Sequence, residues 1–339
     1  MPLYLYILRR ILLSVPLLIG ITLVAFIIAN LVPSDPMTAN LSQRAMSDPT
    51  IVAAFRAEWG LDQTLPVQYL TYLKNLLSGN LGKSIRSRRP VIDDLRQYLP
   101  ATIELATAAT IFGVGAGLLF GLFSAIARNT VFDILARAIS LIGISAPVFW
   151  LALLSLLVFY VQLRLFPGPG RLDSGIQAPS SVTGFYTVDS LIAGNWLAFR
   201  NAVGHLILPS VVLGSYSMGL VTRITRASML ESLSADYVRT AKSKGLRQRI
   251  IVYRHAFRNA LIPVLTVIGL SYGVLLSGAV LTETIFAWPG IGRYAYRAST
   301  TLDFPAIMGV SLVIALIFTI VNLTVDVLYY LADPRLRAR

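Results

Sequence analysis

One segment of the sequence has the residue types and spacing of a serine nucleophile. Gly269, Ser271 and Gly273 match the G-x-S-x-G pattern, in which a serine on a sharp turn attacks a carbonyl carbon and a histidine takes its proton. The pattern lies inside a continuous apolar stretch, and the only histidines in the chain are His205 and His255. We therefore interpret the glycines as helix-packing positions and predict no catalytic residue.

A second segment resembles the end of a phosphate-binding loop. Gly82, Lys83 and Ser84 match its last three positions, but the pattern also requires a glycine five residues before Gly82, where the chain has Leu77. The chain has no cysteine and only two histidines, which leaves little for a metal centre. We predict no nucleotide site, no metal site and no cofactor bound by this chain.

The most informative segment covers residues 222–259. It contains nine basic residues, and its apolar residues recur at helical spacing on both sides of Gly245. This pattern predicts a helix, a glycine turn and a second helix, with one apolar face available for a partner. The alternative is a solvated basic loop, but 38 patterned residues are more than membrane topology requires.

Residues 283–293 mix apolar and aromatic side chains with one proline and two glycines. Irregular backbone of this kind at membrane depth is tolerated where it lines a cavity or is buried in protein. Glu283, Phe286 and Trp288 are therefore candidates for the translocation path or for a gate on the outer side. For Glu283, an interfacial charge facing water is an equally good interpretation.

The elements that must position these residues are membrane helices. The chain has 339 residues, of which 55% are hydrophobic and 13% are charged, so it lacks the charged surface of a soluble globular protein. Because a span needs about 20 apolar residues, six stretches qualify. They are 11–32, 105–127, 138–161, 205–222, 261–282 and 306–329. The sequence predicts an all-α membrane protein with six transmembrane helices.

The distribution of Lys and Arg predicts the orientation. With the N-terminus in the cytoplasm, the inner segments hold 16 basic residues against 5 acidic residues, and the outer segments hold 13 against 11. This asymmetry follows the positive-inside rule, so both termini are expected in the cytoplasm. The same rule explains the net charge of +13 without nucleic acid as a partner.

The remaining segments suggest the domain organisation. The long outer connection contains two amphipathic stretches, 49–59 and 65–77, which predict short helices, whereas 162–204 is rich in Gly, Pro and Ser and predicts an irregular loop. We divide the chain into an N-terminal end with the first span (1–32), a periplasmic loop (33–100), a transmembrane domain (101–330) containing the segment 223–260, and a cytoplasmic tail (331–339).

Two further features concern helix packing. Gly113, Gly117 and Gly121 recur at every fourth position of the second span, which favours close approach of another helix over a flexible gate. Asp326 lies near the inner end of the last span, where we expect it to pair with a basic group.

Several motifs in order resemble one family, the inner-membrane permease subunits of bacterial ABC importers for dipeptides, oligopeptides and nickel. They are Arg9-Arg10, Val32-Pro33-Ser34-Asp35-Pro36, Gly60-Leu61-Asp62, Gly79-Asn80-Leu81-Gly82, Asp236-Tyr237-Val238-Arg239-Thr240-Ala241, Lys244-Gly245-Leu246, Arg258-Asn259-Ala260, Leu281-Thr282-Glu283-Thr284-Ile285-Phe286, Trp288-Pro289-Gly290 and Asp333-Pro334-Arg335. The resemblance runs nearly from end to end and implies a type-I ABC importer transmembrane fold.

The resemblance also implies partners and a coupling site. The family's cytoplasmic loop has the general form E-A-A-x-x-x-G, and here Arg239, Thr240 and Ala241 stand in place of its first three residues. In the family this loop docks into a groove on an ATPase subunit. The implied coupling residues are Asp236, Tyr237, Arg239, Thr240, Ala241, Lys244, Gly245 and Leu246. The implied partners are a second homologous permease, two ATP-binding subunits that hold ATP and Mg, a periplasmic substrate-binding protein and a peptide substrate.

The resemblance thus predicts a non-catalytic subunit of an ATP-driven importer of di-/oligopeptides or peptide-like solutes in the bacterial inner membrane. Two alternatives are a stand-alone membrane carrier, which predicts inverted repeats, and an intramembrane hydrolase, which needs a catalytic pair within the spans. The sequence shows neither feature. It does not identify the solute, the pore-lining residues, the second permease or the ATPase.

Overall fold

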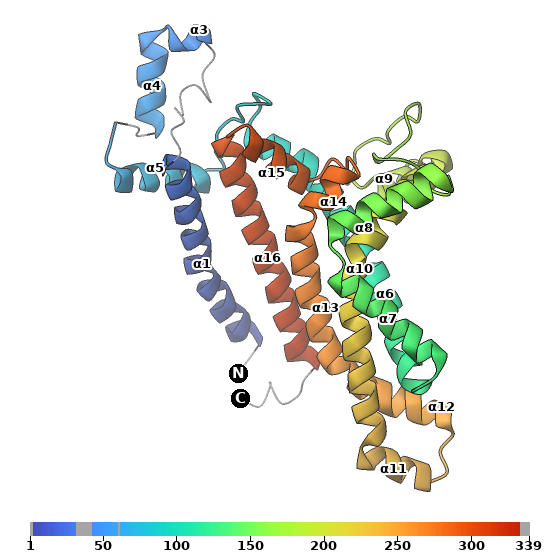
Figure 1. Ribbon diagram of the computed structural model, residues 1–339. Coiled ribbons are helices and arrows are strands. Elements are labelled where there is room, and N and C mark those ends of the chain that lie inside the picture. The colour runs from blue at the N-terminus through green and yellow to red at the C-terminus, as the bar shows by residue number, and fades with distance from the viewer. Residues whose placement is uncertain (1–2, 32–42, 60–61, 333–339) are drawn as a thin grey trace.

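The computed structural model describes residues 3–31, 43–59 and 62–332, and these residues are almost entirely helical (Figure 1). The helices that cross or approach the membrane are α1 (Leu3–Leu31), α6 (Val91–Ile126), α7 (Val131–Ser145), α8 (Val148–Ser155) with the π-helix η1 (Leu156–Gln162), α10 (Trp196–Ser234), α13 (Arg258–Gly278) and α16 (Phe304–Ala332). The shorter helices are α3 (Gln43–Met46), α4 (Pro49–Trp59), α5 (Leu65–Leu77), α9 (Tyr186–Ile192), α11 (Asp236–Ser243), α12 (Gln248–Ile250) with the π-helix η2 (Ile251–Phe257), α14 (Val280–Ile285) and α15 (Ile291–Thr300).

Four of these helices are each long and apolar enough to cross a membrane, namely α1, α6, α10 and α16. Two further spans are present if each bent pair of helices is counted as one. The first pair joins α7 to α8 and η1 across a bend of 110°. The second joins Gln248–Leu261, which covers α12, η2 and the start of α13, to Pro263–Leu276 of α13 across a bend of 50°. The all-helical membrane architecture is therefore as predicted, whereas the described residues give four to six spans.

Glycines bring α6 and α10 into close contact along the membrane. A Cβ atom added to Gly117 would lie 2.7 Å from the Val221 Cβ, and one added to Gly113 would lie 2.8 Å from the Gly214 carbonyl oxygen. Such distances are too short for a real side chain, so only glycine permits this approach. By contrast, a Cβ at Gly115 would have no atom within 4 Å. The predicted packing role of this glycine face is confirmed.

The structure corrects the expected ends of two spans and the expected loop. Helix α6 begins at Val91 and α10 begins at Trp196, whereas their spans were predicted from 105 and 205. Residues 162–204 are not wholly irregular, because they contain α9 and the start of α10. The first turns of α6 and α9 contain acidic residues, Asp94 and Asp189, which the fold buries, so these turns do not stand out in the sequence as apolar. The two short outer helices, α4 and α5, have the predicted bounds.

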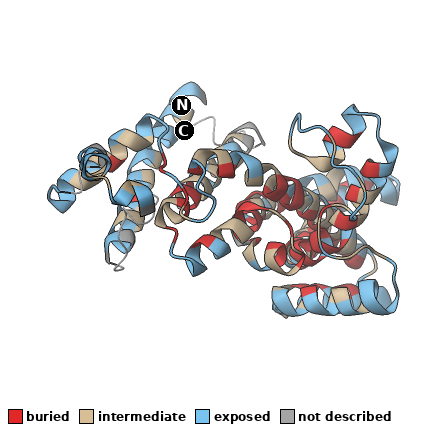
Figure 2. Ribbon diagram, turned by 90° about the horizontal axis from the view of Figure 1, so that it is seen from above, coloured by how far each residue is buried: buried red, intermediate tan, exposed pale blue. Residues whose placement is uncertain are grey.

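Buried residues gather in the helices around α6 and α10, and the peripheral helices are largely exposed (Figure 2). One cluster of the core joins the N-terminal half of α6 to α10, α13 and Trp288, and a second joins the C-terminal half of α6 to η2. Helix α1 lies at the edge beside α16, and almost none of it is buried. The central helices therefore form a well-packed core, to which both the segment 222–259 and the residues around Glu283 are attached.

Candidate functional site

The predicted coupling segment lies at one tip of the molecule, at the end opposite α3 and α4 (Figure 1). Helix α10 runs without interruption to Ser234, α11 follows almost immediately, and the chain then turns back at Gly245 into α12 and η2. Gly245 has a φ of 73° and its N–H donates to the Lys242 carbonyl at 2.9 Å. Since L-residues rarely adopt positive φ, glycine is the natural residue for this turn.

A small apolar cluster holds the two arms of this turn together. Val238 and Ala241 of α11 contact Ile251 of η2, and all three are buried. On the other side, Tyr237 and Leu246 are exposed although both are large and apolar. The segment therefore has its own small core and still presents an apolar surface outward.

The remaining predicted coupling residues are polar and face solvent. Asp236 and Arg239 form an ion pair at 3.5 Å, with exposed side chains. The Thr240 hydroxyl donates to the Asp236 carbonyl at 3.1 Å, and Lys244 is exposed. Exposed pairs of this kind contribute little to stability, so these side chains are free to contact a partner.

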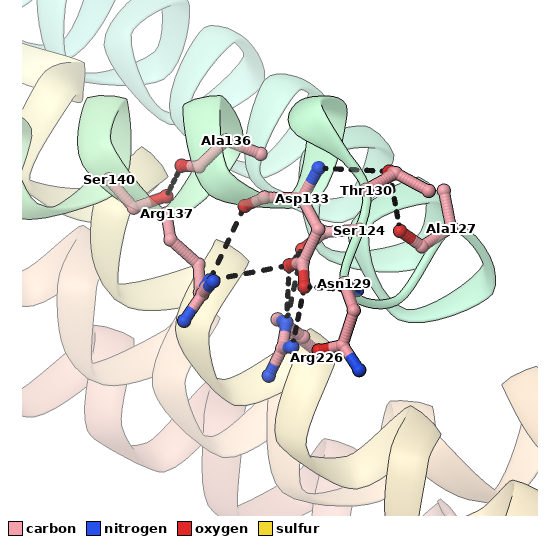
Figure 3. Close-up of polar contacts among 9 residues, drawn as sticks. All are labelled: Ser124, Ala127, Asn129, Thr130, Asp133, Ala136, Arg137, Ser140 and Arg226. Atoms are coloured by element: carbon pink, nitrogen blue, oxygen red, sulfur yellow. Dashed lines mark hydrogen bonds and ion pairs between the residues drawn. The ribbon is translucent and has the colours of Figure 1, made fainter.

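A buried ion pair fixes the helix that leads into this segment (Figure 3). The Arg226 guanidinium of α10 donates to both carboxylate oxygens of Asp133, at 2.8 and 2.9 Å. The Ser124 hydroxyl and the Asn129 backbone N–H also donate to this carboxylate. Because Asp133 is fully buried, the turn between α6 and α7 is firmly attached to α10, eight residues before α10 ends at Ser234. We call Ser124, Asp133 and Arg226 the inner clamp.

Sequence reasoning missed the inner clamp. In the sequence, Asp133 is only one of the five acidic residues of the inner segments. A usable signal was present, because Thr130 lies three residues before Asp133 and this spacing is typical of a helix N-terminus. The Thr130 hydroxyl does accept from the Asp133 N–H, at 3.5 Å. Nothing in the local sequence indicates Arg226 as the partner, since it lies 93 residues away.

At the other end of the central helices, Glu283 is completely buried. Its carboxylate accepts from the Thr102 hydroxyl of α6 at 2.7 Å and from the Arg293 backbone N–H at 2.9 Å. A Cβ atom at Gly290 would collide with this carboxylate, and one at Gly292 would lie 2.8 Å from the Val280 Cα and 3.0 Å from a Glu283 carboxylate oxygen. Both glycines are therefore needed for the close packing around Glu283. Burial raises the pKa of Glu283, which lies beyond the apolar stretch of α13, to about 7, although the hydrogen bond from Thr102 acts in the opposite direction.

Phe286 and Trp288 are also buried, and they lie close to Glu283 in the chain. The Trp288 indole N–H donates to the Ala101 carbonyl at 2.8 Å. Phe286 packs against Ala152 and Leu208. The three candidate path residues therefore join α14 to α6, α8 and α10 inside this subunit, and their role in a path or gate stays a prediction.

A second buried ion pair lies beside Trp288 and was not foreseen. Arg171, from the connection after η1, donates to the Glu104 carboxylate of α6, and both side chains are buried. The guanidinium also lies 3.6 Å from the centre of the Tyr186 ring, a favourable cation–π distance. The other Glu104 oxygen accepts from the Thr187 hydroxyl at 2.7 Å. This pair anchors the connection between η1 and α10.

No group of three His, Asp or Glu side chains suited to a metal ion occurs within residues 3–31, 43–59 and 62–332. The motifs at 32–36, at 60–61 and at 333–335, and the predicted tail from residue 333 onward, lie outside the described residues. Among the described motif residues, Arg9 and Arg10 lie on α1 and Gly79 to Gly82 follow α5. The longer motifs fall into two places, the coupling segment and the buried cluster around Glu283.

Comparison with known proteins gives consistent results along the whole chain. Residues 117–338 match the family model for the binding-protein-dependent transport system inner membrane component, and residues 3–106 match the model for its N-terminal region. The probable D,D-dipeptide transport system permease protein of Escherichia coli is 47% identical over 94% of this chain and 93% of its own. The dipeptide transport system permease protein of Alkalihalophilus pseudofirmus is 45% identical over 98% and 99%. The di/tripeptide permease of Pseudomonas aeruginosa is 44% identical over 98% of both chains.

The family resemblance predicted from the motifs is therefore confirmed over nearly the whole length, as is the predicted place in the inner membrane. The chain belongs to the inner-membrane permease components of binding-protein-dependent ABC transport systems.

Proposed function

We propose that this chain is the permease subunit of an ATP-driven importer that moves di-/oligopeptides or peptide-like solutes across the bacterial inner membrane. The observation that supports it most is the end-to-end similarity to permeases named for D,D-dipeptides, dipeptides and di/tripeptides. These relatives are transport proteins, so this subunit is proposed to be non-catalytic.

The proposed coupling site is the segment 223–260, centred on Gly245. Two ATP-binding subunits would supply ATP and Mg, and one of them would dock on α11 and the turn that follows it. ATP can drive transport only if the closed ATPase pair binds one state of the permease more tightly than another. The exposed Tyr237 and Leu246 offer apolar surface for that differential contact, and the inner clamp attaches the segment to two long helices.

The proposed topology has six spans and both termini in the cytoplasm. The distribution of Lys and Arg supports it, and six spans require each bent helix pair to cross the membrane once. Under this topology α11 lies in the cytoplasm, and α4, α5, α9 and α15 lie on the outer side. A periplasmic binding protein would then deliver the solute to that outer surface, and a second homologous permease would complete the pore.

The test is purification of the tagged full chain from its native membrane in mild detergent, followed by mass identification of co-purifying proteins. The expected result is a second permease and two ATP-binding subunits, which are lost when Tyr237 and Leu246 are both changed to Ser. A matched control changes Leu77 and Leu197, which are exposed outer residues, to Ser. Retention of the ATPases by the first variant would refute the coupling assignment.

Transport itself is measured in vesicles with a labelled dipeptide, ATP and the binding protein. Uptake that needs ATP and the co-purified subunits supports the proposal. Uptake by the isolated chain would instead establish a stand-alone carrier. Peptide cleavage that is abolished by Ser271→Ala would establish the hydrolase alternative.

A further inference from the structure

Helices α1 and α16 run side by side (Figure 1). A hollow with a volume of about 170 Å³ lies between them and is lined by Arg10, Ser14 and Leu17 on α1 and by Thr319, Asn322 and Asp326 on α16. One ordered water needs only ~10–15 Å³. The hollow therefore has room for a much larger group.

The floor of this hollow is polar, which is unusual at the lipid-facing edge of a membrane protein. The Arg10 guanidinium donates to Asp326 at 3.1 Å, and a second nitrogen lies 3.1 Å from the other carboxylate oxygen. This is the ion pair that the sequence predicted for Asp326. The Thr319 hydroxyl is buried and has no hydrogen-bond partner among the described residues. Ser14 on α1 and Asn322 on α16 add further polar side chains to the lining.

Cationic side chains lie at the mouth of the hollow. A second hollow, of about 310 Å³, adjoins the first through Arg10 and Leu13 and is also lined by Tyr6 and Arg9. Arg9 is exposed and has no ion-pair partner among residues 3–31, 43–59 and 62–332. Since Asp326 neutralises Arg10, Arg9 leaves the mouth with a net positive charge.

The order of side chains along α1 matches that of a phospholipid. The cations and the Tyr6 hydroxyl come first, Leu13 and Ser14 follow beside the polar floor, and Leu17 lines the wall farther along the helix. Basic pockets between membrane helices are suited to anionic headgroups. A second membrane protein would instead require small residues or a complementary helix face, whereas α1 and α16 enclose a hollow whose opening is positively charged.

We propose that the hollow between α1 and α16 binds one anionic phospholipid, with its phosphate at Arg9 and Arg10, its glycerol region beside Ser14 and Asn322, and an acyl chain along Leu17. This site lies at the edge of the molecule, away from the coupling segment. It depends only on the membrane location of the chain and not on the proposed transport activity.

The experiment uses the full chain purified together with its native partners, and measures bound lipid by native mass spectrometry. The probes are phosphatidylglycerol and phosphatidylethanolamine, and the competitor is free glycerol phosphate. We expect preferential binding of phosphatidylglycerol, and a loss of about fivefold in Arg9→Gln, because one basic side chain near the membrane surface contributes about that factor. Arg128→Gln is the matched control, since Arg128 is exposed in the turn between α6 and α7.

A second pair of variants tests the hollow rather than the charge. Ser14→Phe fills the hollow and should abolish binding, whereas Leu12→Phe, at an exposed neighbouring position that does not line it, should leave binding unchanged. Equal binding of the two lipids, equal losses in Arg9→Gln and Arg128→Gln, or retained binding in Ser14→Phe would each overturn the proposal. Displacement by glycerol phosphate would reduce the site to one for a free phosphate, and binding only by the chain without partners would show that a protein covers it.

Discussion

The turn at Gly245 allows the sharpest test of how the coupling segment works. We predict that Gly245→Val lowers ATP-dependent transport while the assembly still forms. A Cβ atom at this position would meet nothing within 4 Å, so the effect cannot come from a clash within this chain. It must come from the backbone, whose φ of 73° lies in the left-handed region.

The size of the effect follows from this conformation. An L-residue in the left-handed region costs roughly 1–2 kcal/mol, and a β-branched one tends to the upper end. Burial of the small cluster of Val238, Ala241 and Ile251 stabilises the native turn against other conformations. Its two larger side chains contribute about 1.5–3 kcal/mol each before ordering costs are subtracted. A strain of this size changes the population of the native turn by roughly 5- to 30-fold.

The assay compares initial rates of labelled dipeptide uptake in vesicles containing the complete transporter, together with substrate-stimulated ATP hydrolysis. Two matched variants separate the causes. Gly245→Asn should keep at least about half of the transport, because Asn tolerates positive φ. Gly194→Val introduces the same strain in the outer connection, where φ is 65° and no atom lies within 4 Å of a Cβ. It should lower stability equally but leave the coupling of ATP hydrolysis to uptake intact.

The result that would refute this reasoning is normal, fully coupled transport by Gly245→Val. Equal loss in Gly245→Asn and Gly245→Val would also contradict it, since side-chain volume rather than backbone conformation would then be the cause. If Gly194→Val uncoupled transport to the same degree, the coupling role would not belong to the turn at Gly245.

Three further predictions concern the central helices. Arg226→Gln should lower the free energy of unfolding by about 3 kcal/mol, because it removes the cation that donates to both oxygens of the buried Asp133 carboxylate and leaves only the longer contact with Arg137 at 3.5 Å. Arg137→Gln, whose side chain is 53% exposed, should cost under ~1 kcal/mol; equal shifts in thermal unfolding in detergent would contradict the clamp. Because burial raises the pKa of Glu283 to about 7, the folded state binds the Glu283 proton more tightly than the unfolded chain does. The contribution of this proton to the free energy of unfolding is therefore complete below about pH 4.5 and is lost as the pH rises through about 7. Stability measured from pH 5 to 8 should therefore decline less in Glu283→Gln than in the wild type, and parallel curves would disprove the assignment. Gly117→Ala should lower the free energy of unfolding by about 1–3 kcal/mol, because the added Cβ would be too close to α10. Gly115→Ala should raise it by about 0.5–1 kcal/mol, because alanine is the better helix former. A change of the same sign in both variants would exclude close packing as the cause.

The parts of the fold that sequence reasoning located correctly are those determined by local pattern. The glycines of α6 mark its contact with α10 because they recur on one helix face. The bounds of α4 and α5 follow from amphipathic spacing and from Pro and Gly at their ends. The position of the coupling turn follows in the same way from one glycine between two helical patterns.

The parts that could not be predicted depend on partners distant in the chain. The composition of the connection after η1 predicts a loop, because it is rich in glycine, proline and serine. The contact between Arg171 and Glu104, which orders this connection, has no signal in the local sequence. Asp189 then accepts the N–H groups of Thr183 and Gly184, which orders the chain at the start of α9. Glu283 was correctly singled out as unusual, but its contact with Thr102 joins residues 181 positions apart.

These distant contacts explain how a small segment could act on the far side of the membrane. Helix α6 carries Thr102 and Glu104 in its N-terminal half and Ser124 near its C-terminal end, and the glycine contacts join it to α10 in between. The inner clamp attaches α10 to the same body eight residues before α10 ends at Ser234. A helix pair held at these points resists local bending, because each contact is buried and has one well-packed arrangement. We therefore expect a displacement of α11 to reach the buried cluster around Glu283 as a tilt of α6 and α10 together, and loss of the inner clamp to uncouple the two ends before it unfolds either of them.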